Sequence, residues 1–283
     1  MQKYQRVSDL FIAVLIIIFY ILFYAGHPLF SPDEGRYAEI GREMLASHQY
    51  IIPYLDNIPY FEKPPLMYWL VSFSQYLLGI TTASARLPVV LIAIFGIIST
   101  YRFTRTIYDR RTGLLTAGIL STSLVYYCLG HYLTLDMPLA VWLSCSLFSF
   151  LLVIKHSDNH LWPYRRYALT SGYFFIAMAI MTKGLVGFVF PCMIIGLWII
   201  LHWRWGLIKK FALFRGLIFV AVLIVPWHVL IYQKYHNFIS YYIIDQQILR
   251  YSTHIAGRSM PITFYLITVI ASTFPWVFLL YVH

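Results

Sequence analysis

Charged residues are scarce in this sequence, and so are cysteines. Only 11% of the 283 residues are charged and 60% are hydrophobic, whereas soluble domains carry about 25% charged residues. This composition excludes an ordinary soluble domain and predicts an integral membrane protein. The three cysteines, Cys128, Cys145 and Cys192, lie inside apolar runs with no metal-type spacing. Neither a disulfide framework nor a zinc site built from cysteine is therefore expected.

Acidic residues are the rarer charge, and the net charge is +10. In a soluble protein this excess would suggest a nucleic-acid partner. Here the basic residues lie in short segments between apolar runs, where positive charge keeps a segment on the cytoplasmic side. We therefore expect membrane lipids as partners and no nucleic acid. No small-residue cleavage pattern follows the first apolar run, which predicts an uncleaved first span.

The apolar runs predict an all-α, polytopic membrane protein. Only helices and closed barrels satisfy the backbone in lipid, and these runs have the length of helices. Eight spans are expected, at about 10–26, 87–101, 113–130, 137–154, 167–181, 185–201, 216–232 and 262–281.

The basic residues orient these spans. Four segments hold 13 of the 21 basic residues: Lys3 and Arg6; Arg102, Arg105, Arg110 and Arg111; Lys155, Arg165 and Arg166; Arg204, Lys209, Lys210 and Arg215. If all four are cytoplasmic, the spans alternate and the segments 27–86, 131–136, 182–184 and 233–261 lie outside. This scheme makes the short apolar stretch 64–79 an interfacial helix on the outer surface, with Tyr68, Trp69 and Tyr76 in the headgroup zone.

The first outer segment carries an acidic island, 31–65, with six of the eleven acidic residues. Ser31 and Pro32 are typical of a helix start, and Glu34 is placed to close a capping box. Glu34 is therefore interpreted mainly as a cap. Asp33 is interpreted as functional, because a second carboxylate at this helix start has no structural need.

Other outer residues have two interpretations each. Glu62 and Lys63 precede two prolines, either as a surface ion pair or as a fixed carboxylate and ammonium. Asp136 either complements a helix start or belongs to the site. Lys183 lies in a tight outer turn between two spans, against the positive-inside tendency, which favours an anionic partner that Arg250 could also bind. The alternative, reaching a lipid phosphate, applies to Lys234 and Arg258. His131 is expected to be a hydrogen-bonded structural histidine. Taken together, the cations beside carboxylates on the outer face suit transfer from a lipid-phosphate donor.

Several motifs resemble the membrane glycosyltransferases that use polyprenyl-phosphate sugars, in the branch of lipid A aminoarabinose transferase and protein O-mannosyltransferase. They are DEGRYAEIGREM from Asp33, YFEKPPLMYWL from Tyr60, LDMPLA from Leu135 and TKG from Thr182. The resemblance implies a GT-C fold over 1–283 as a single domain, with juxtamembrane helices in the outer loop 27–86. It also implies a multi-pass protein of the bacterial inner membrane with its active site on the extracytoplasmic face.

The resemblance assigns roles to the candidates. It implies that Asp33, Glu62 and Asp136 are catalytic and that Lys63, Lys183 and Arg250 bind the donor phosphate. The donor would be a polyprenyl-phosphate-linked sugar and the acceptor a lipid or a protein, with inversion at the sugar. A divalent metal is the one cofactor that it suggests, with Glu62 as the best ligand, and no organic cofactor is expected.

The sequence departs from the family in two places. Gln247 stands where relatives often have a histidine that can help to hold a metal, which leaves the metal open. Relatives also continue beyond the position of His283, which suggests a truncated or split protein whose remaining spans a second chain would supply. The alternatives are a transporter or lipid flippase, against which the near absence of ionisable residues inside the spans argues, and an inactive truncated relative.

Overall fold

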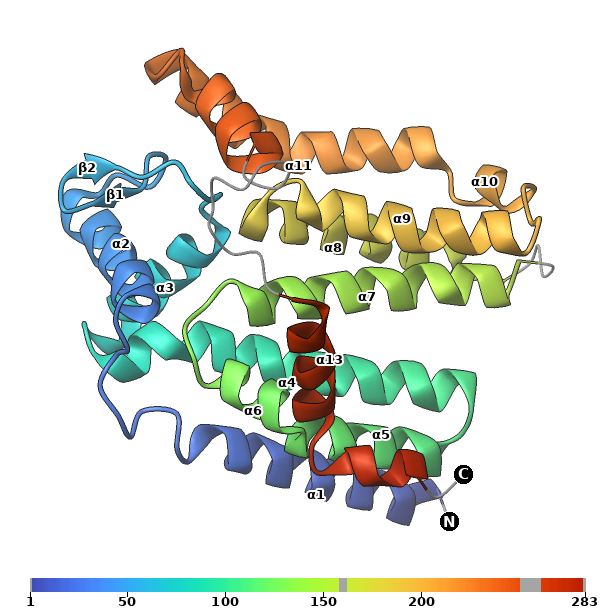
Figure 1. Cartoon of the computed structure of the whole chain (residues 1–283). Coiled ribbons are helices and arrows are strands. Elements are labelled where there is room, and N and C mark those ends of the chain that lie inside the picture. The colour runs from blue at the N-terminus through green and yellow to red at the C-terminus, as the bar shows by residue number, and fades with distance from the viewer. Residues whose placement is uncertain (1, 158–161, 250–260, 282–283) are drawn as a thin grey trace.

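The computed structural model describes residues 2–157, 162–249 and 261–281 and is almost entirely helical (Figure 1). Its helices are α1 (Gln2–Ile21), α2 (Asp33–Ser47), α3 (Leu66–Leu78), α4 (Thr82–Ile107), α5 (Arg110–Thr122), α6 (Leu124–Gly130), α7 (Asp136–Lys155), α8 (Arg165–Lys183), α9 (Val186–Leu201), α10 (Leu207–Lys210), α11 (Leu213–Lys234) and α13 (Ile262–Thr273), with a π-helix η1 (Ser240–Leu249) and a 3₁₀ helix η3 (Trp276–Tyr281). Two short strands, β1 (Tyr54–Leu55) and β2 (Ile58–Pro59), pair antiparallel. The expected all-α class is confirmed.

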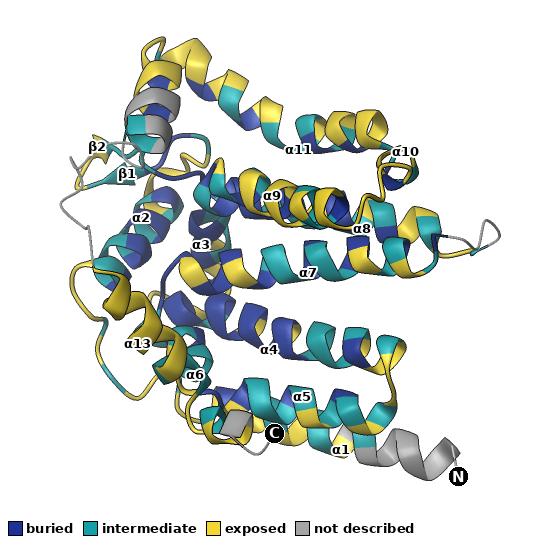
Figure 2. Cartoon of the chain, turned by 45° about the vertical axis from the view of Figure 1, so that its right-hand side comes forward, coloured by how far each residue is buried: buried dark blue, intermediate teal, exposed yellow. Residues whose placement is uncertain are grey.

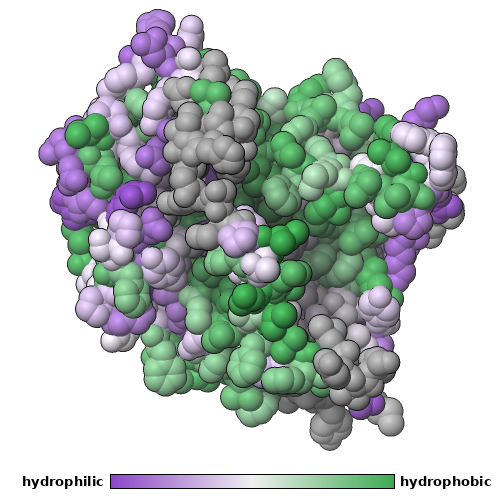
Figure 3. Space-filling view, viewed as in Figure 1, coloured by the Kyte–Doolittle hydropathy of each residue, from purple (hydrophilic) through white to green (hydrophobic). Residues whose placement is uncertain are grey.

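The long helices α1, α4, α5, α7, α8, α9 and α11 run side by side, while α2, α3 and the β1–β2 hairpin lie at one end of this bundle (Figure 1). Hydrophilic residues gather at the end that carries α2 and the hairpin and again at the opposite end, and hydrophobic residues cover most of the face between them (Figure 3). An apolar belt between two polar ends is the surface that a bilayer requires.

The predicted basic segments meet at the end of the bundle away from α2. The Lys155 ammonium at the end of α7 donates to the carbonyl oxygens of Thr106 and Ile107 at the end of α4, at 3.3 and 3.0 Å. The Arg165 guanidinium at the start of α8 donates to the carbonyl of Lys210, at 2.8 Å. The grouping of these segments that the charge pattern predicts is thus confirmed.

The count of eight spans is not confirmed. Among the described residues, three helices, α4, α7 and α11, are long and apolar enough to cross a membrane, and the α5–α6 pair makes a fourth if this broken helix is one span. The expected span 113–130 is bent by 66° between α5 and α6. The expected span 262–281 is interrupted before Pro275, and α13 alone has 12 residues, or about 18 Å, short of the roughly 30 Å hydrocarbon core.

The stretch 64–79 does form a helix at the membrane-boundary end, as expected, but α3 is not an open interfacial helix. It packs between α2 and α4, so Met67, Tyr68 and Val71 are completely buried (Figure 2). Tyr68 is therefore packed inside the protein, whereas Tyr76 is 70% exposed. The largest buried cluster joins α2, α3, α4 and α7, and it fixes the acidic segment on the bundle.

Close packing of α8 on α11 depends on Gly216. A Cβ atom at this position would lie 2.0 Å from the Tyr173 ring, whose hydroxyl donates to the Phe211 carbonyl at 2.9 Å. We expect Gly216→Ala to lower the free energy of unfolding by about 1–3 kcal/mol, the usual cost of overpacking. The measurement is unfolding in mixed detergent micelles, with Gly118→Ala as the control. A Cβ at Gly118 meets nothing within 4 Å, so that variant should be neutral or slightly stabilised. Equal stability of the two variants would contradict the packing.

Candidate functional site

The charges of three of the predicted carboxylates act on Tyr37, in the second turn of α2. Burial raises the pKa of the Tyr37 phenol to about 12, and the negative charges of Asp33, Asp136 and Glu62 add to this shift. The three carboxylates belong to the start of α2, the start of α7 and the turn before α3. Residues up to 103 positions apart in the sequence are therefore brought to one place at the polar end of the bundle.

Tyrosines and an arginine line this place. The Tyr60 hydroxyl donates to Glu62 Oε2 at 3.2 Å, and Tyr60 also interacts electrostatically with the Arg36 side chain. A guanidinium nitrogen of Arg36 also lies 3.7 Å from a carboxylate oxygen of Asp33. The rings of Tyr37 and Tyr68 are stacked, with centroids 5.9 Å apart. Arg36 was not among the residues predicted for the site, although its position three residues after Asp33 on a helix was an available signal.

Lys63 is buried, with 6% of its surface exposed. It lies between Glu62 and two prolines that begin α3, and the preceding Phe61 ring packs edge-on against Tyr235, 5.0 Å between centroids. The turn is thus fixed between the tyrosines and the end of α11. A buried ammonium requires anionic or hydrogen-bonding partners, and Lys63 does have an interaction partner in the structure.

Asp136 and Lys183 form an ion pair with each other. The Asp136 side chain is 56% exposed and that of Lys183 is 25% exposed. Lys183 ends α8, and Gly184 follows with a φ of 84°, a left-handed conformation that glycine adopts without strain. The expected tight turn is thus present. The pair joins a candidate catalytic residue to a candidate phosphate-binding residue, two roles that the sequence analysis kept separate.

Arg250 and the nearby His254 lie outside the described residues. Gln247 belongs to η1, but its side chain is not among those that the structure describes. Two predictions therefore stay predictions: that Arg250 binds the donor phosphate, and that Gln247, in place of a histidine, leaves metal binding open.

Glu34 is not the cap that the sequence suggested. α2 begins at Asp33, Pro32 precedes it, and no side-chain hydrogen bond caps the helix. Glu34 is instead completely buried and accepts two hydrogen bonds from Arg86, both at 2.7 Å. It also accepts backbone N–H bonds from Phe30 at 2.9 Å and Leu133 at 2.8 Å. Burial alone would raise the pKa of Glu34, but these hydrogen bonds lower it below its ordinary value.

Arg86 completes this buried pair from the start of α4. Its guanidinium donates to the carbonyl oxygens of His27 and Pro28, both at 2.7 Å. The Glu34–Arg86 ion pair thus joins three segments: the end of the segment after α1, the start of α2 and the loop before α7. The start of α2 carries Asp33, and the loop leads to Asp136. The sequence signal for Arg86 was its position outside all four basic segments, at the polar end of a span.

His131 confirms the expectation of a structural histidine. It is buried, and its ring nitrogens lie 2.7 Å from the Tyr127 carbonyl oxygen and 3.0 Å from that of Tyr20. These contacts fix the start of the loop that leads to Asp136.

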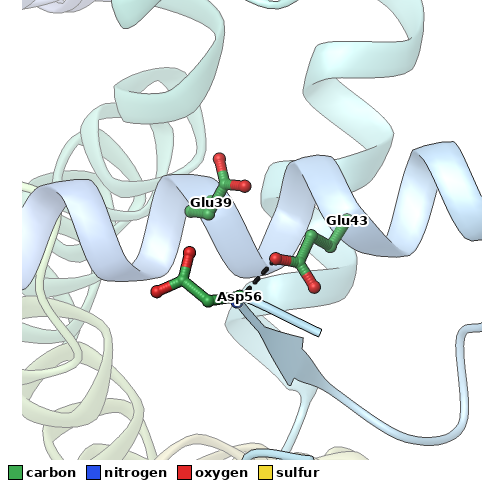
Figure 4. A group of neighbouring side chains, drawn as sticks. All are labelled: Glu39, Glu43 and Asp56. Carbon is green, nitrogen blue, oxygen red and sulfur yellow. Dashed lines mark hydrogen bonds between the residues drawn. The ribbon is translucent and has the colours of Figure 1, made fainter. Parts of the chain in front are cut away.

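One group of carboxylates has the spacing of a metal site, but Glu62 is not in it. Among the described residues, ligand atoms of Glu39, Glu43 and Asp56 lie within 4.8 Å of one another (Figure 4). Glu39 is held by two hydrogen bonds from Arg42, at 2.6 and 2.8 Å. Glu43 accepts the backbone N–H of Asp56 at 2.7 Å. These bonds account for the carboxylates of Glu39 and Glu43. The metal at Glu62 stays a prediction.

The sequence family of dolichyl-phosphate-mannose-protein mannosyltransferases matches residues 9–242. The chain belongs to this family. A structure of ArnT from Cupriavidus metallidurans bound to undecaprenyl phosphate is similar, with a TM-score of 0.89 and 29% identity over 95% of this chain and 49% of that one. The apo structure of the same protein gives a TM-score of 0.83 over 97% of this chain and 49% of that one.

Curated members of the family agree with this likeness. The undecaprenyl phosphate-alpha-4-amino-4-deoxy-L-arabinose arabinosyl transferase of Pectobacterium carotovorum is 34% identical over 97% of this chain and 49% of its own length. The relative of the same name from Erwinia tasmaniensis is 30% identical over 99% and 50%. The chain spans about half the length of these relatives. The GT-C resemblance is thus confirmed, and the protein is a multi-pass membrane protein of the bacterial inner-membrane type.

Proposed function

We propose that this chain carries the donor site of a glycosyltransferase that takes a sugar from undecaprenyl phosphate and transfers it at the α2 end of the bundle. The observation that carries the proposal is that the charges of Asp33, Glu62 and Asp136 act together on Tyr37 and that the buried Lys63 directly follows Glu62, in a fold similar to ArnT bound to undecaprenyl phosphate. The names of the relatives make 4-amino-4-deoxy-L-arabinose the first sugar to test. The grouping of basic segments at the other end supports an extracytoplasmic active face.

The residues divide the reaction between them. Lys63 lies where it can neutralise the charge that develops on the phosphate as the sugar leaves. Asp33, which is half exposed, is placed to accept the proton of an acceptor hydroxyl, or to orient the acceptor if this is itself a phosphate. Glu62, which accepts a hydrogen bond from Tyr60, is placed to bind the sugar. Direct displacement without a covalent intermediate would invert the anomeric configuration.

For a divalent metal, we propose only that Glu62 would be one of its ligands. The carboxylate of Glu62 is a suitable oxygen ligand for a hard cation, and such an ion would add positive charge at the donor phosphate. The roles of Lys63 and Asp33 stand without it. The comparisons favour the transferase over the transporter that the sequence left as an alternative.

The test of the donor site is binding of undecaprenyl phosphate to the chain in detergent. We expect Lys63→Gln to weaken binding about ten- to hundredfold, because a hydrogen bond to a charged group contributes about 1.5–3 kcal/mol. Lys209→Gln is the matched control, since Lys209 is exposed at the other end of the bundle. Equal affinities of the two variants would contradict the assignment of Lys63.

A further inference from the structure

An apolar groove lies between α9 and α11 and reaches the end of the bundle away from α2. Both helices pack on α8, and the short helix α10 connects their ends on that side (Figure 1). The groove has a volume of about 360 Å³, which is within the range of ligand pockets. Its walls include Ile176 of α8, Ile195 of α9, Ile208 of α10 and Leu217 of α11. None of the donor-site residues that the structure describes lines it.

The shape and chemistry of this groove suit a hydrocarbon chain. Its lining follows α9 from Phe188 to Ile200, over 12 positions, or about 18 Å of helix. One leaflet has a similar depth, because the hydrocarbon core of a bilayer is roughly 30 Å thick. The Tyr173 hydroxyl in the wall donates to the Phe211 carbonyl at 2.9 Å, so this hydroxyl is not left unpaired. An apolar cavity of this kind does not hold water, which leaves it free for an acyl chain.

The wall of the groove is open at Gly196 of α9. A Cβ atom at this position would meet nothing within 4 Å, although Gly196 lines the groove. At Gly187, earlier in the same helix, a Cβ atom would lie 2.4 Å from the Ala179 backbone of α8. α9 thus packs closely on α8 near its start and leaves space beside it at Gly196. A larger side chain at Gly196 has room in the groove, where it would take the place of a ligand.

Positive charge lies at the end of the groove beside α10. The backbone N–H of Arg204 donates to the carbonyl of Ile199, a lining residue, at 3.1 Å. Trp205 also lines the groove and is 50% exposed, as suits a ring in the headgroup zone. Arg204 and Arg215 are exposed, and neither side chain has an ion pair or a hydrogen bond within the described part of the chain. No acidic residue occurs between positions 159 and 244, so no side chain of α8 to α11 neutralises this charge.

We propose that the groove is a binding site for one anionic phospholipid of the adjoining leaflet, with an acyl chain along α9 and the phosphate beside Arg204. The positive charge selects an anionic headgroup, since each basic residue near a membrane surface strengthens binding of anionic lipid about fivefold. The donor lipid is a different ligand, because Lys63, to which its phosphate is assigned, precedes α3 at the opposite end of the bundle (Figure 1). The site is therefore independent of the proposed function.

The experiment is native mass spectrometry of the chain in detergent, with phosphatidylglycerol as the probe. We expect one saturable site that Gly196→Leu weakens at least tenfold, because each methylene group excluded from the groove costs about a factor of four in affinity. Gly118→Leu is the matched control, since a Cβ at Gly118 on α5 also meets nothing within 4 Å.

A second pair of variants tests the headgroup. Arg204→Gln should weaken the same site about fivefold. Arg111→Gln, which removes an exposed arginine from the start of α5 at the same end of the bundle, should not. Unfolding in mixed detergent micelles checks that all four variants fold. If Gly196→Leu did not fold, the exposed Arg204 would decide the question.

Phosphatidylglycerol binding that depends on both Gly196 and Arg204 supports the proposal. Equal affinities within either pair of variants would overturn it, and so would equal binding of phosphatidylcholine with the same acyl chains. Displacement of phosphatidylglycerol by undecaprenyl phosphate would mean that the groove holds a polyprenyl chain. Loss of binding in the presence of the remaining half of the Pectobacterium relative would mean that further helices cover the groove. Either of these two results would also overturn the assignment.

Discussion

Asp33→Asn is expected to lower the rate constant for sugar transfer by about 10²–10⁴-fold, the usual contribution of a positioned acid or base. The substitution keeps the size of the side chain and removes its ability to accept a proton. Within the described part of the chain, the one ion pair of Asp33 is the long contact with Arg36, at 3.7 Å, and 46% of its side chain is exposed. An exposed pair of this kind contributes little to stability, so the variant should fold and bind undecaprenyl phosphate normally.

The matched control for Asp33 is Asp56→Asn. Asp56 is exposed at the same end of the molecule, in the hairpin turn, and asparagine tolerates its positive φ. The measurement is single-turnover transfer from a radiolabelled lipid-linked sugar at saturating donor. Because the chain spans about half of its relatives, it is assayed both alone and together with the remaining half of the Pectobacterium relative. Asp33→Asn with the rate of Asp56→Asn would show that Asp33 is not catalytic.

Arg86→Ala is expected to lower the free energy of unfolding by about 3–5 kcal/mol. The variant leaves the Glu34 carboxylate buried without its partner, and breaking a buried ion pair from one side costs this much. It also leaves the carbonyl oxygens of His27 and Pro28 without their donor. Because this pair joins the segments that carry Asp33 and Asp136, transfer should fall with stability.

The control for Arg86 is Arg42→Ala, which breaks the partly exposed pair of Arg42 with Glu39 and should cost at most about 1 kcal/mol. The double variant Glu34→Gln/Arg86→Met removes both buried charges, so it should be more stable than Arg86→Ala. Unfolding in mixed detergent micelles measures all three. If Arg86→Ala were no less stable than Arg42→Ala, the buried pair would not hold these segments together.

Local chemistry made part of this structure predictable from the sequence. The prolines at positions 32 and 65 predicted the starts of α2 and α3 within a residue or two, because proline fits the first turn of a helix. The grouping of basic residues followed from their spacing between apolar runs. Asp33 and Glu62 stood out as carboxylates in an apolar chain, and the structure does bring them to one place.

The rest depended on contacts between distant segments. Glu34 and Arg86 are 52 residues apart, and Glu34 had a sufficient local explanation as a cap. Tertiary burial changed this interpretation. The apolar stretch 262–281 has the composition of a span, yet it is interrupted before Pro275, and α13 lies against the short helix α6. Apolarity alone does not report such a break.

The most direct test of the central claim is transfer of 4-amino-4-deoxy-L-arabinose from radiolabelled undecaprenyl phosphate donor in membranes that contain the chain, compared with membranes that contain Lys63→Gln or Lys209→Gln. The account predicts label in a lipid product with the unaltered chain and with Lys209→Gln, and at least tenfold less with Lys63→Gln at limiting donor. Equal product with both lysine variants would contradict the claim that the α2 end of the bundle binds a lipid-phosphate donor through Lys63.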